Sequence, residues 1–278
     1  MKRLQILSII GLVIFTSMTT TQAIAATRDY PIIDAHIHVD DKASQDEFFK
    51  QAKANGIKAF IAHTHDENSE TPKIGDLNST YCLGVQDKFN LVKIEAGLKS
   101  KKFGCVKIYL GYIYKYAYDK AYLPIYKLAE KYQIPIVFHT GDTNTSKGKL
   151  KYADPMTIDE VAVDYPKVNF IMAHLGNPWI NTASEVAYKN PNVYVDMSAL
   201  LIGDISSYSQ DDLQKYLIGP ISWAFGYMES SKKMMYGSDF PLADTGKYLQ
   251  AVLKAIPAAN HREFLYENAA RVFNIKVK

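Results

Sequence analysis

The stretch that decides the fold is Pro31-Ile32-Ile33-Asp34-Ala35-His36-Ile37-His38. Its apolar and β-branched residues predict a strand, and its three ionisable side chains point to one face because side chains alternate along a strand. An amphipathic segment follows at residues 45–54 and ends at Gly56, before a second apolar strand at residues 57–63. A strand, a helix and another strand without a hairpin turn predict parallel βα units rather than a meander.

The same alternation continues from Val106 to the end of the chain. Further strands are predicted at residues 80–85 (a weak candidate), 106–110, 135–140, 168–175, 192–198 and 233–239. Helices are predicted at residues 120–132, 157–164, 182–189, 210–228, 247–256 and 261–273. Eight such strands with right-handed crossovers predict a (β/α)8 TIM barrel with a C-terminal helix. We expect one domain, residues 26–278, distorted around strands 2 and 3 because residues 66–80 are polar and irregular.

Residues 1–25 have the pattern of a secretory signal peptide. Lys2 and Arg3 precede an apolar run at residues 4–15, and a segment of small residues ends in Ala23-Ile24-Ala25. A membrane anchor would need about 20 apolar residues, and this run is shorter. The sequence therefore predicts an exported protein, periplasmic or secreted, with no membrane attachment after cleavage.

The composition excludes several classes of protein and of partner. A chain that is 47% hydrophobic and 22% charged is neither disordered nor fibrous. Its 32 basic and 29 acidic residues nearly balance, so we expect no nucleic acid partner. Cys82 and Cys105 could pair in an oxidising compartment. Because Cys105 immediately precedes an apolar strand, we expect a small buried thiol there instead.

Ionisable residues recur near the carboxyl ends of the predicted strands. Lys107, His139, His174 and Asp239 are separated by roughly one, one and two βα units. Because the carboxyl ends of barrel strands converge on one mouth, we expect these side chains to meet His36 and His38 there. Mixed imidazole and carboxylate ligands suit zinc, manganese or iron.

In combination and in order, the motifs of the chain resemble those of the amidohydrolase superfamily, within it the amidohydrolase-related, decarboxylase-like branch. The resemblance lies in Ile33–His38, Val106–Tyr109, Ile134–Gly141, Ala173–Gly176, Asn192–Ser198, Gly237–Pro241 and Glu267–Phe273. It covers nearly the whole chain after the signal peptide and implies the same barrel fold.

The resemblance also implies a metal site. Its expected ligands are His36, His38, His139 and Asp239, joined by Lys107 and His174 if two ions bind. Asp239 would carry the proton, and His174 would polarise the substrate carbonyl or orient the nucleophile. Lys107 is expected either to bridge two ions as a carboxylated lysine or to hold a substrate carboxylate. We expect one divalent ion rather than two, zinc or else manganese.

Three further residues are expected to contact the substrate. They are His63 at the end of the second strand, Tyr109 after the fourth strand and Asp196 at the end of the seventh strand. Asp34 lies deeper on the first strand, where a supporting or packing role is expected.

The sequence leaves three functions open. The leading hypothesis is a metal-dependent hydrolase of a small-molecule ester, lactone or amide, in which metal-activated water attacks the carbonyl. The alternative is a nonoxidative decarboxylase that uses the same ligands. A non-catalytic exported metal or ligand binder is the third, and the presence of a proton carrier argues against it. The chain is compatible with a homo-oligomer.

Overall fold

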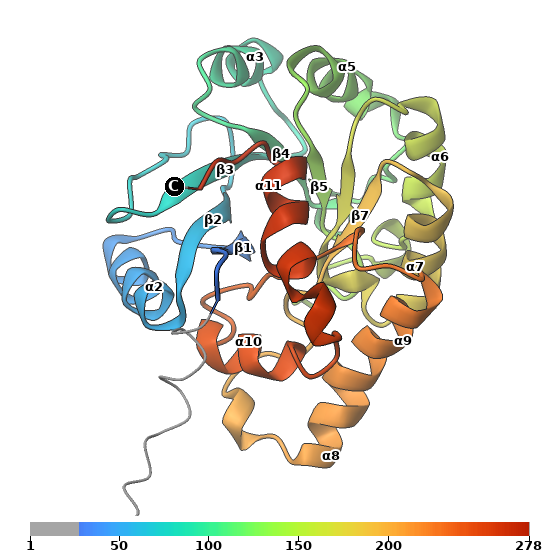
Figure 1. Ribbon diagram of the computed structural model, residues 1–278. Coiled ribbons are helices and arrows are strands. Elements are labelled where there is room, and N and C mark those ends of the chain that lie inside the picture. The colour runs from blue at the N-terminus through green and yellow to red at the C-terminus, as the bar shows by residue number, and fades with distance from the viewer. Residues whose placement is uncertain (1–27, 278) are drawn as a thin grey trace, which may run out of the picture.

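The computed structural model describes residues 28–277, so the predicted signal peptide lies outside the described residues. Eight parallel strands follow one another around a nearly closed barrel in chain order, which confirms the predicted TIM barrel (Figure 1). The strands are β1 (Ile32–Ile37), β2 (Ile57–His63), β3 (Asn78–Val85), β4 (Cys105–Ile108), β5 (Ile136–Phe138), β6 (Phe170–Met172), β7 (Val193–Asp196) and β8 (Met234–Met235).

The barrel closes between β1 and the residues that follow β8. The backbone N–H of Ala35 donates to the carbonyl of Tyr236 (2.9 Å), and that of His38 donates to the carbonyl of Phe240 (2.7 Å). The N–H of Asp239 donates in turn to the carbonyl of His36 (2.8 Å). This seam brings the first and last predicted metal ligands, His36 and Asp239, together, although they are 203 positions apart along the chain.

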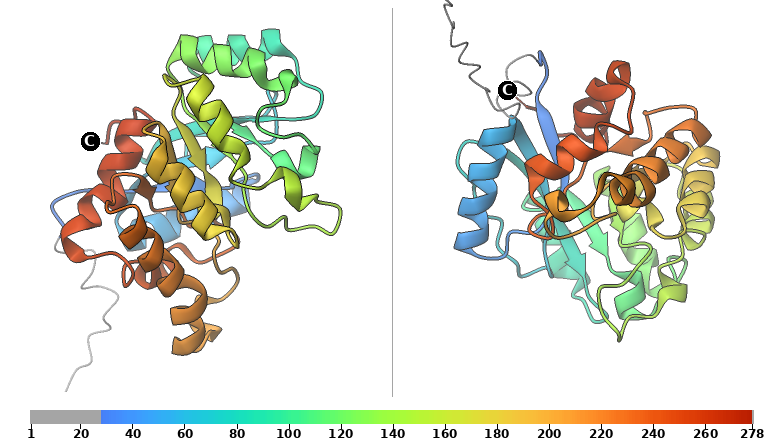
Figure 2. Two further views of the ribbon diagram at one scale, coloured as in Figure 1. Left: turned by 90° about the vertical axis from the view of Figure 1, so that its right-hand side faces the viewer. Right: turned by 90° about the horizontal axis from the view of Figure 1, so that it is seen from below.

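Helices surround most of the barrel, as the two views of Figure 2 show. They are α2 (Lys42–Asn55), α3 (Leu91–Lys99), α4 (Leu110–Ile113), α5 (Leu123–Tyr132), α6 (Thr157–Asp164), α7 (Ile180–Lys189), α8 (Gln210–Leu213), α9 (Gly219–Tyr227), α10 (Thr245–Val252) and α11 (Asn268–Val272). Helix α2 begins at a capping box on Asp41 and ends at Gly56, whose φ of 74° suits glycine. Between residues 28 and 277, none of the helices combines the length and the apolar character needed to cross a bilayer.

The connection between β2 and β3 contains no helix within the described chain, in agreement with the distortion expected there. Helix α3 has no counterpart among the predicted helices. The long helical region predicted at residues 210–228 is continuous in the structure, although a π-helical segment, Gln214–Ile218, lies between α8 and α9. Helix α8 and its neighbours form the lower edge of the molecule in Figure 1.

Apolar residues fill two regions, one between the strands and the helices and one inside the barrel. Inside the barrel, inward-facing residues of the strands pack together with residues of α11 and of the segment after it. Helix α11 therefore closes the end of the barrel opposite the carboxyl ends of the strands.

The barrel interior also contains a disulfide bond between Cys82 on β3 and Cys105 on β4, which are partners in the parallel register. Both residues are buried, but the expectation of a free thiol at Cys105 is wrong. The two residues meet because the register of β3 against β4 places them side by side, and no local sequence pattern reports that register.

Candidate active site

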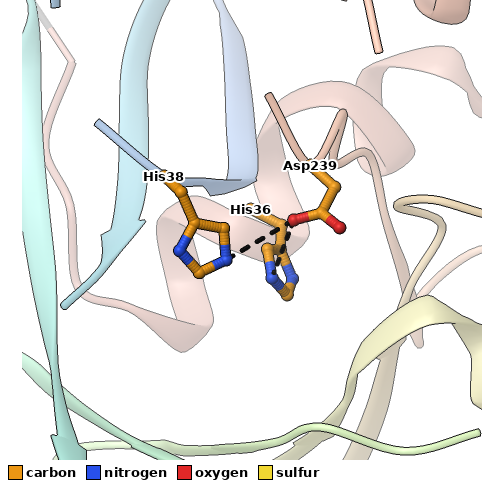
Figure 3. A group of neighbouring side chains, drawn as sticks. All are labelled: His36, His38 and Asp239. Carbon is orange, nitrogen blue, oxygen red and sulfur yellow. Dashed lines mark ion pairs between the residues drawn. The ribbon is translucent and has the colours of Figure 1, made fainter. Parts of the chain in front are cut away.

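The floor of the mouth holds His36 on β1, His38 directly after β1 and Asp239 in the turn after β8 (Figure 3). The carboxylate Oδ1 of Asp239 lies 3.4 Å from His36 Nε2 and 3.5 Å from His38 Nε2. Asp239 has a φ of 59°, and its backbone N–H is fixed to β1, which turns its side chain toward the two imidazoles. The three ligand atoms lie within 4.8 Å of one another.

This cluster has the properties of a divalent metal site. Burial lowers the pKa of His36 well below its ordinary value and that of His38 to about 3, so both imidazoles are neutral and offer lone pairs. Asp239 Oδ1 is buried and has no hydrogen-bond partner. The two distances from Asp239 Oδ1 to the imidazole nitrogens, 3.4 and 3.5 Å, match the roughly 3.4 Å edge of a tetrahedron around an ion with bonds of about 2.0–2.1 Å. His36, His38 and Asp239 therefore fit the metal that the family implies.

His36 is oriented from behind by Asp196 at the end of β7. Its Nδ1 lies 2.9 Å from Asp196 Oδ2, which fixes the proton on Nδ1 and leaves Nε2 free to bind a metal. The other oxygen of Asp196 accepts from the backbone N–H of His174 (3.1 Å) and from Ser198 (2.5 Å to its Oγ). Asp196 is 1% exposed and lies behind the ligands, away from the wall where a substrate contact was expected.

His139 and His174 form a second pair of imidazoles at the mouth, with 3.2 Å between His139 Nδ1 and His174 Nε2. His139 Nε2 lies 2.8 Å from the carbonyl of Asp142, which requires a proton on that nitrogen. His174 Nδ1 lies 2.9 Å from Ser198 Oγ, whose own proton goes to Asp196. The two nitrogens that face each other are then both acceptors, and a cation between them would satisfy both.

Lys107 lies beneath this cluster and is fully buried. Its Nζ is 3.3 Å from His36 Nε2. Burial lowers the pKa of Lys107 to about 8, although the carboxylates of Asp196 and Asp239 act in the opposite direction. Burial likewise raises the pKa of Asp239 to about 7, against the effect of Lys107.

Two other buried groups surround the cluster. Burial raises the pKa of Asp34 to about 7, and Asp34 Oδ1 accepts from the backbone N–H groups of Ser238 (2.9 Å) and His36 (3.3 Å). Asp34 thus ties β1 to the turn that carries Asp239. The centroids of the His63 and His36 rings lie 4.1 Å apart. Neither ring nitrogen of His63 has a hydrogen-bond partner. His63 is 2% exposed and lies outside the main pocket.

The pocket above the cluster has a volume of about 360 Å³. Its lining residues are His38, Tyr109, Tyr112, His139, Asp142, Asn144, His174, Asn177, Ala199, Leu200, Leu201, Ile202, Tyr208, Asp239 and Leu242. Tyr109 therefore lies where a substrate contact was expected. The polar residues at 142, 144 and 177 and the apolar residues at 199–202 and 242 have no motif in the sequence. Only their place directly after strands β5, β6, β7 and β8 could have indicated them.

These features define a TIM barrel whose strands carry, at their carboxyl ends, a group of histidine and aspartate side chains that could hold a metal ion. The chain belongs to the amidohydrolase family, whose model matches residues 91–275. No curated protein sequence matches the chain. The family and the solved structures of similar fold point to a metal-dependent enzyme of the amidohydrolase superfamily, either a hydrolase or a decarboxylase.

Three of these solved structures represent the different reactions. A 5-carboxyvanillate decarboxylase from Novosphingobium aromaticivorans with bound manganese is 12% identical, with 88% of this chain and 97% of that one covered and a TM-score of 0.62. A dihydroorotase from Campylobacter jejuni is 14% identical, with 89% and 84% covered and a TM-score of 0.63. A probable 2-pyrone-4,6-dicarboxylic acid hydrolase from Acinetobacter baumannii is 11% identical, with 88% and 100% covered and a TM-score of 0.60. At these identities the likeness establishes the fold.

Proposed function

We propose that the chain is a metal-dependent hydrolase of a small-molecule ester, lactone or amide. The observation that carries this proposal is the unpartnered oxygen of Asp239, buried between two neutral imidazoles at the floor of an open pocket. A purely structural role would leave that oxygen hydrogen-bonded.

The residues of the cluster have complementary tasks. A divalent ion bound here would act as a Lewis acid toward the substrate carbonyl and would lower the pKa of a bound water toward 7. Asp239, whose carboxylate lies beside the two imidazoles and lines the pocket, accepts a proton from the nucleophile and returns it to the leaving group. His174 directs its Nε2 lone pair into the mouth, which suits it to orient the nucleophile or to bind a second ion.

Decarboxylation is the alternative reaction, and the similarity to a manganese-containing decarboxylase supports it. Product analysis separates the two. Incorporation of one oxygen from labelled water into the product, without release of carbon dioxide, is expected of the hydrolase. Release of carbon dioxide without incorporation of oxygen would establish the lyase instead.

One divalent ion, zinc or manganese, is the expected cofactor. Elemental analysis of protein purified without added metal or chelator, compared with the Lys107→Met variant, tests the number of ions. A metal-to-protein ratio near one is expected in both proteins, because Lys107 is not a ligand when a single ion binds. A ratio near two that falls in the variant would establish a bridged pair of ions held with the help of Lys107 and His174.

We also propose that the protein is exported, as residues 1–25 predict. The Cys82–Cys105 disulfide supports this location, because disulfides persist in oxidising compartments. Mass spectrometry of the protein recovered from its producing cells is expected to find a chain that begins after Ala25. An intact N-terminus on the cell-associated protein would contradict export.

A further inference from the structure

The wall of the pocket differs from its floor, because one side is apolar and no lysine or arginine from residues 28–277 lines it. Leu200, Leu201, Ile202 and Leu242 form the apolar side, and Ile202 and Leu242 remain 42% and 38% exposed. Exposed aliphatic side chains at a pocket mouth indicate a surface for an apolar group of a ligand.

The apolar side is held in place as one unit, although it comes from two loops. The N–H of Gly203 donates to the carbonyl of Leu242 (2.7 Å), which joins the loop after β7 to the loop after β8. The hydroxyl of Tyr248 donates to the carbonyl of Met197 (2.7 Å) and accepts from the N–H of Leu200 (3.1 Å). A wall fixed in this way is already formed before a ligand binds.

The charges around the pocket are unfavourable to an anionic ligand. Among the described residues that line it, none is lysine or arginine, whereas Asp142 lies at its mouth. The carboxylate of Asp142 takes part in no ion pair between residues 28 and 277. Lys107 is fully buried and is not among the residues that line the pocket; its Nζ lies 3.3 Å from His36 Nε2, on the floor rather than on the apolar side. A ligand carboxylate on the wall would therefore lose water without gaining a cation.

We propose that this pocket selects an uncharged ester, lactone or amide with an apolar substituent, and rejects counterparts in which that substituent carries a carboxylate. This inference rests on the proposed hydrolase function and names its substrate class. The reacting carbonyl would lie over His38 and Asp239, and the substituent would lie against Leu201 and Leu242.

A matched pair of hydroxamates tests the inference through binding rather than turnover. Hydroxamates chelate divalent metals, and hexanohydroxamic acid differs from adipic acid monohydroxamate only by a carboxylate at the far end of the chain. Isothermal titration of the zinc-loaded protein is expected to give at least tenfold tighter binding for hexanohydroxamic acid. Equal or tighter binding of the carboxylated compound, or no binding of either, would overturn the inference.

Two pairs of variants test the residues. Leu242→Arg is expected to reduce the preference by tenfold or more because it places a cation on the wall, whereas Leu242→Gln leaves most of the preference in place. Asp142→Asn is expected to reduce the preference for the neutral hydroxamate by about threefold, because it removes a negative charge whose repulsion is partly screened by solvent. Asp46→Asn on α2, which removes the same charge far from the pocket, leaves it unchanged. A preference that is the same in all four variants would remove these residues from the explanation.

The outcomes separate this inference from the function on which it rests. Hydrolysis of carboxylated substrates in preference to neutral ones would overturn the inference and leave the hydrolase intact. A tenfold preference for the neutral hydroxamate, without hydrolysis of any neutral ester, lactone or amide, would overturn the hydrolase and leave the character of the wall established.

Discussion

At the scale of single residues, Ser198 connects the two halves of the site. Its hydroxyl lies 2.5 Å from Asp196 Oδ1, which orients His36, and 2.9 Å from His174 Nδ1. Because the hydroxyl proton goes to Asp196, its oxygen accepts from His174 and fixes the tautomer of that ring. Ser198 is therefore a positioning residue, and it is fully buried.

Ser198→Ala is expected to lower kcat by about 10- to 100-fold with little change in KM, as is usual when a partner that orients a metal-site histidine is lost. Steady-state kinetics at equal metal content measures the effect. Ser184→Ala is the matched control, because Ser184 is an equally buried serine on α7 whose hydroxyl has no partner. An equal loss of kcat in both variants would mean that Ser198 acts only through packing.

Asp239→Asn is expected to abolish turnover, at least about a thousandfold, while it preserves the fold. The amide keeps the shape of the side chain but can neither bind a cation well nor accept a proton. Kinetics together with circular dichroism measures both properties. Asp34→Asn removes another buried carboxyl, outside the pocket, and should cost far less activity. Near-normal turnover in Asp239→Asn would remove the proposed mechanism.

At the scale of secondary structure, the disulfide fastens β3 to β4 directly beneath Lys107. Its two residues are 23 positions apart, and cross-linking a loop of that length stabilises a fold by about 3 kcal/mol in the chain-entropy model. The double variant Cys82→Ala, Cys105→Ala should lose about that much free energy of unfolding.

Urea unfolding with and without a reductant checks this prediction. Reduction should lower the midpoint of the wild-type protein toward that of the double variant and leave the double variant unchanged. A wild-type midpoint that does not respond, although the thiols have been shown to be free, would contradict a stabilising role for the disulfide.

The alternation of strands and helices could be predicted from the sequence because each parallel strand is buried on both faces and reads as an apolar run. The meeting of His36, His38 and Asp239, and of His139 and His174, could be predicted for a related reason, since the topology brings all strand ends to one mouth. Helix α3 was not predicted. The strand predicted at residues 233–239 is shorter in the structure, Met234–Met235, because the residues after it turn away from the sheet and position Asp239.

Contacts that depend on register and on loop packing could not be predicted. The pairing of Cys82 with Cys105 needs the offset of β3 against β4. Asp196 was expected to contact substrate because it ends a strand, but its hydrogen bond to His36 depends on the twist of the barrel between β7 and β1. The apolar wall of the pocket arises from two loops that meet only in the folded chain.

At the scale of the whole molecule, the buried histidines make the stability of the metal-free protein depend on pH. Burial lowers the pKa of the five buried histidines at and around the site, to about 3 for His38 and about 4 for His139, whereas unfolded histidines titrate near 6.5. Between pH 6.5 and pH 4 the unfolded chain thus binds protons that the folded chain does not, so this contribution to stability falls as the pH falls. Asp34 and Asp239 act in the opposite direction, because their raised pKa values keep them protonated only in the folded state.

The five histidines contribute more to the pH dependence of the free energy of unfolding than the two carboxyls do. The metal-free protein is therefore expected to lose on the order of 5 kcal/mol of that free energy between pH 6.5 and pH 4.5. Urea unfolding at a series of pH values after removal of metal measures this slope. His63→Leu should make the slope shallower, because it removes one buried imidazole that has no hydrogen-bond partner. His65→Gln, which alters a ring that is 72% exposed, should leave the slope unchanged. A slope of zero, or one that responds equally to both variants, would show that the five buried histidines are not held neutral by burial.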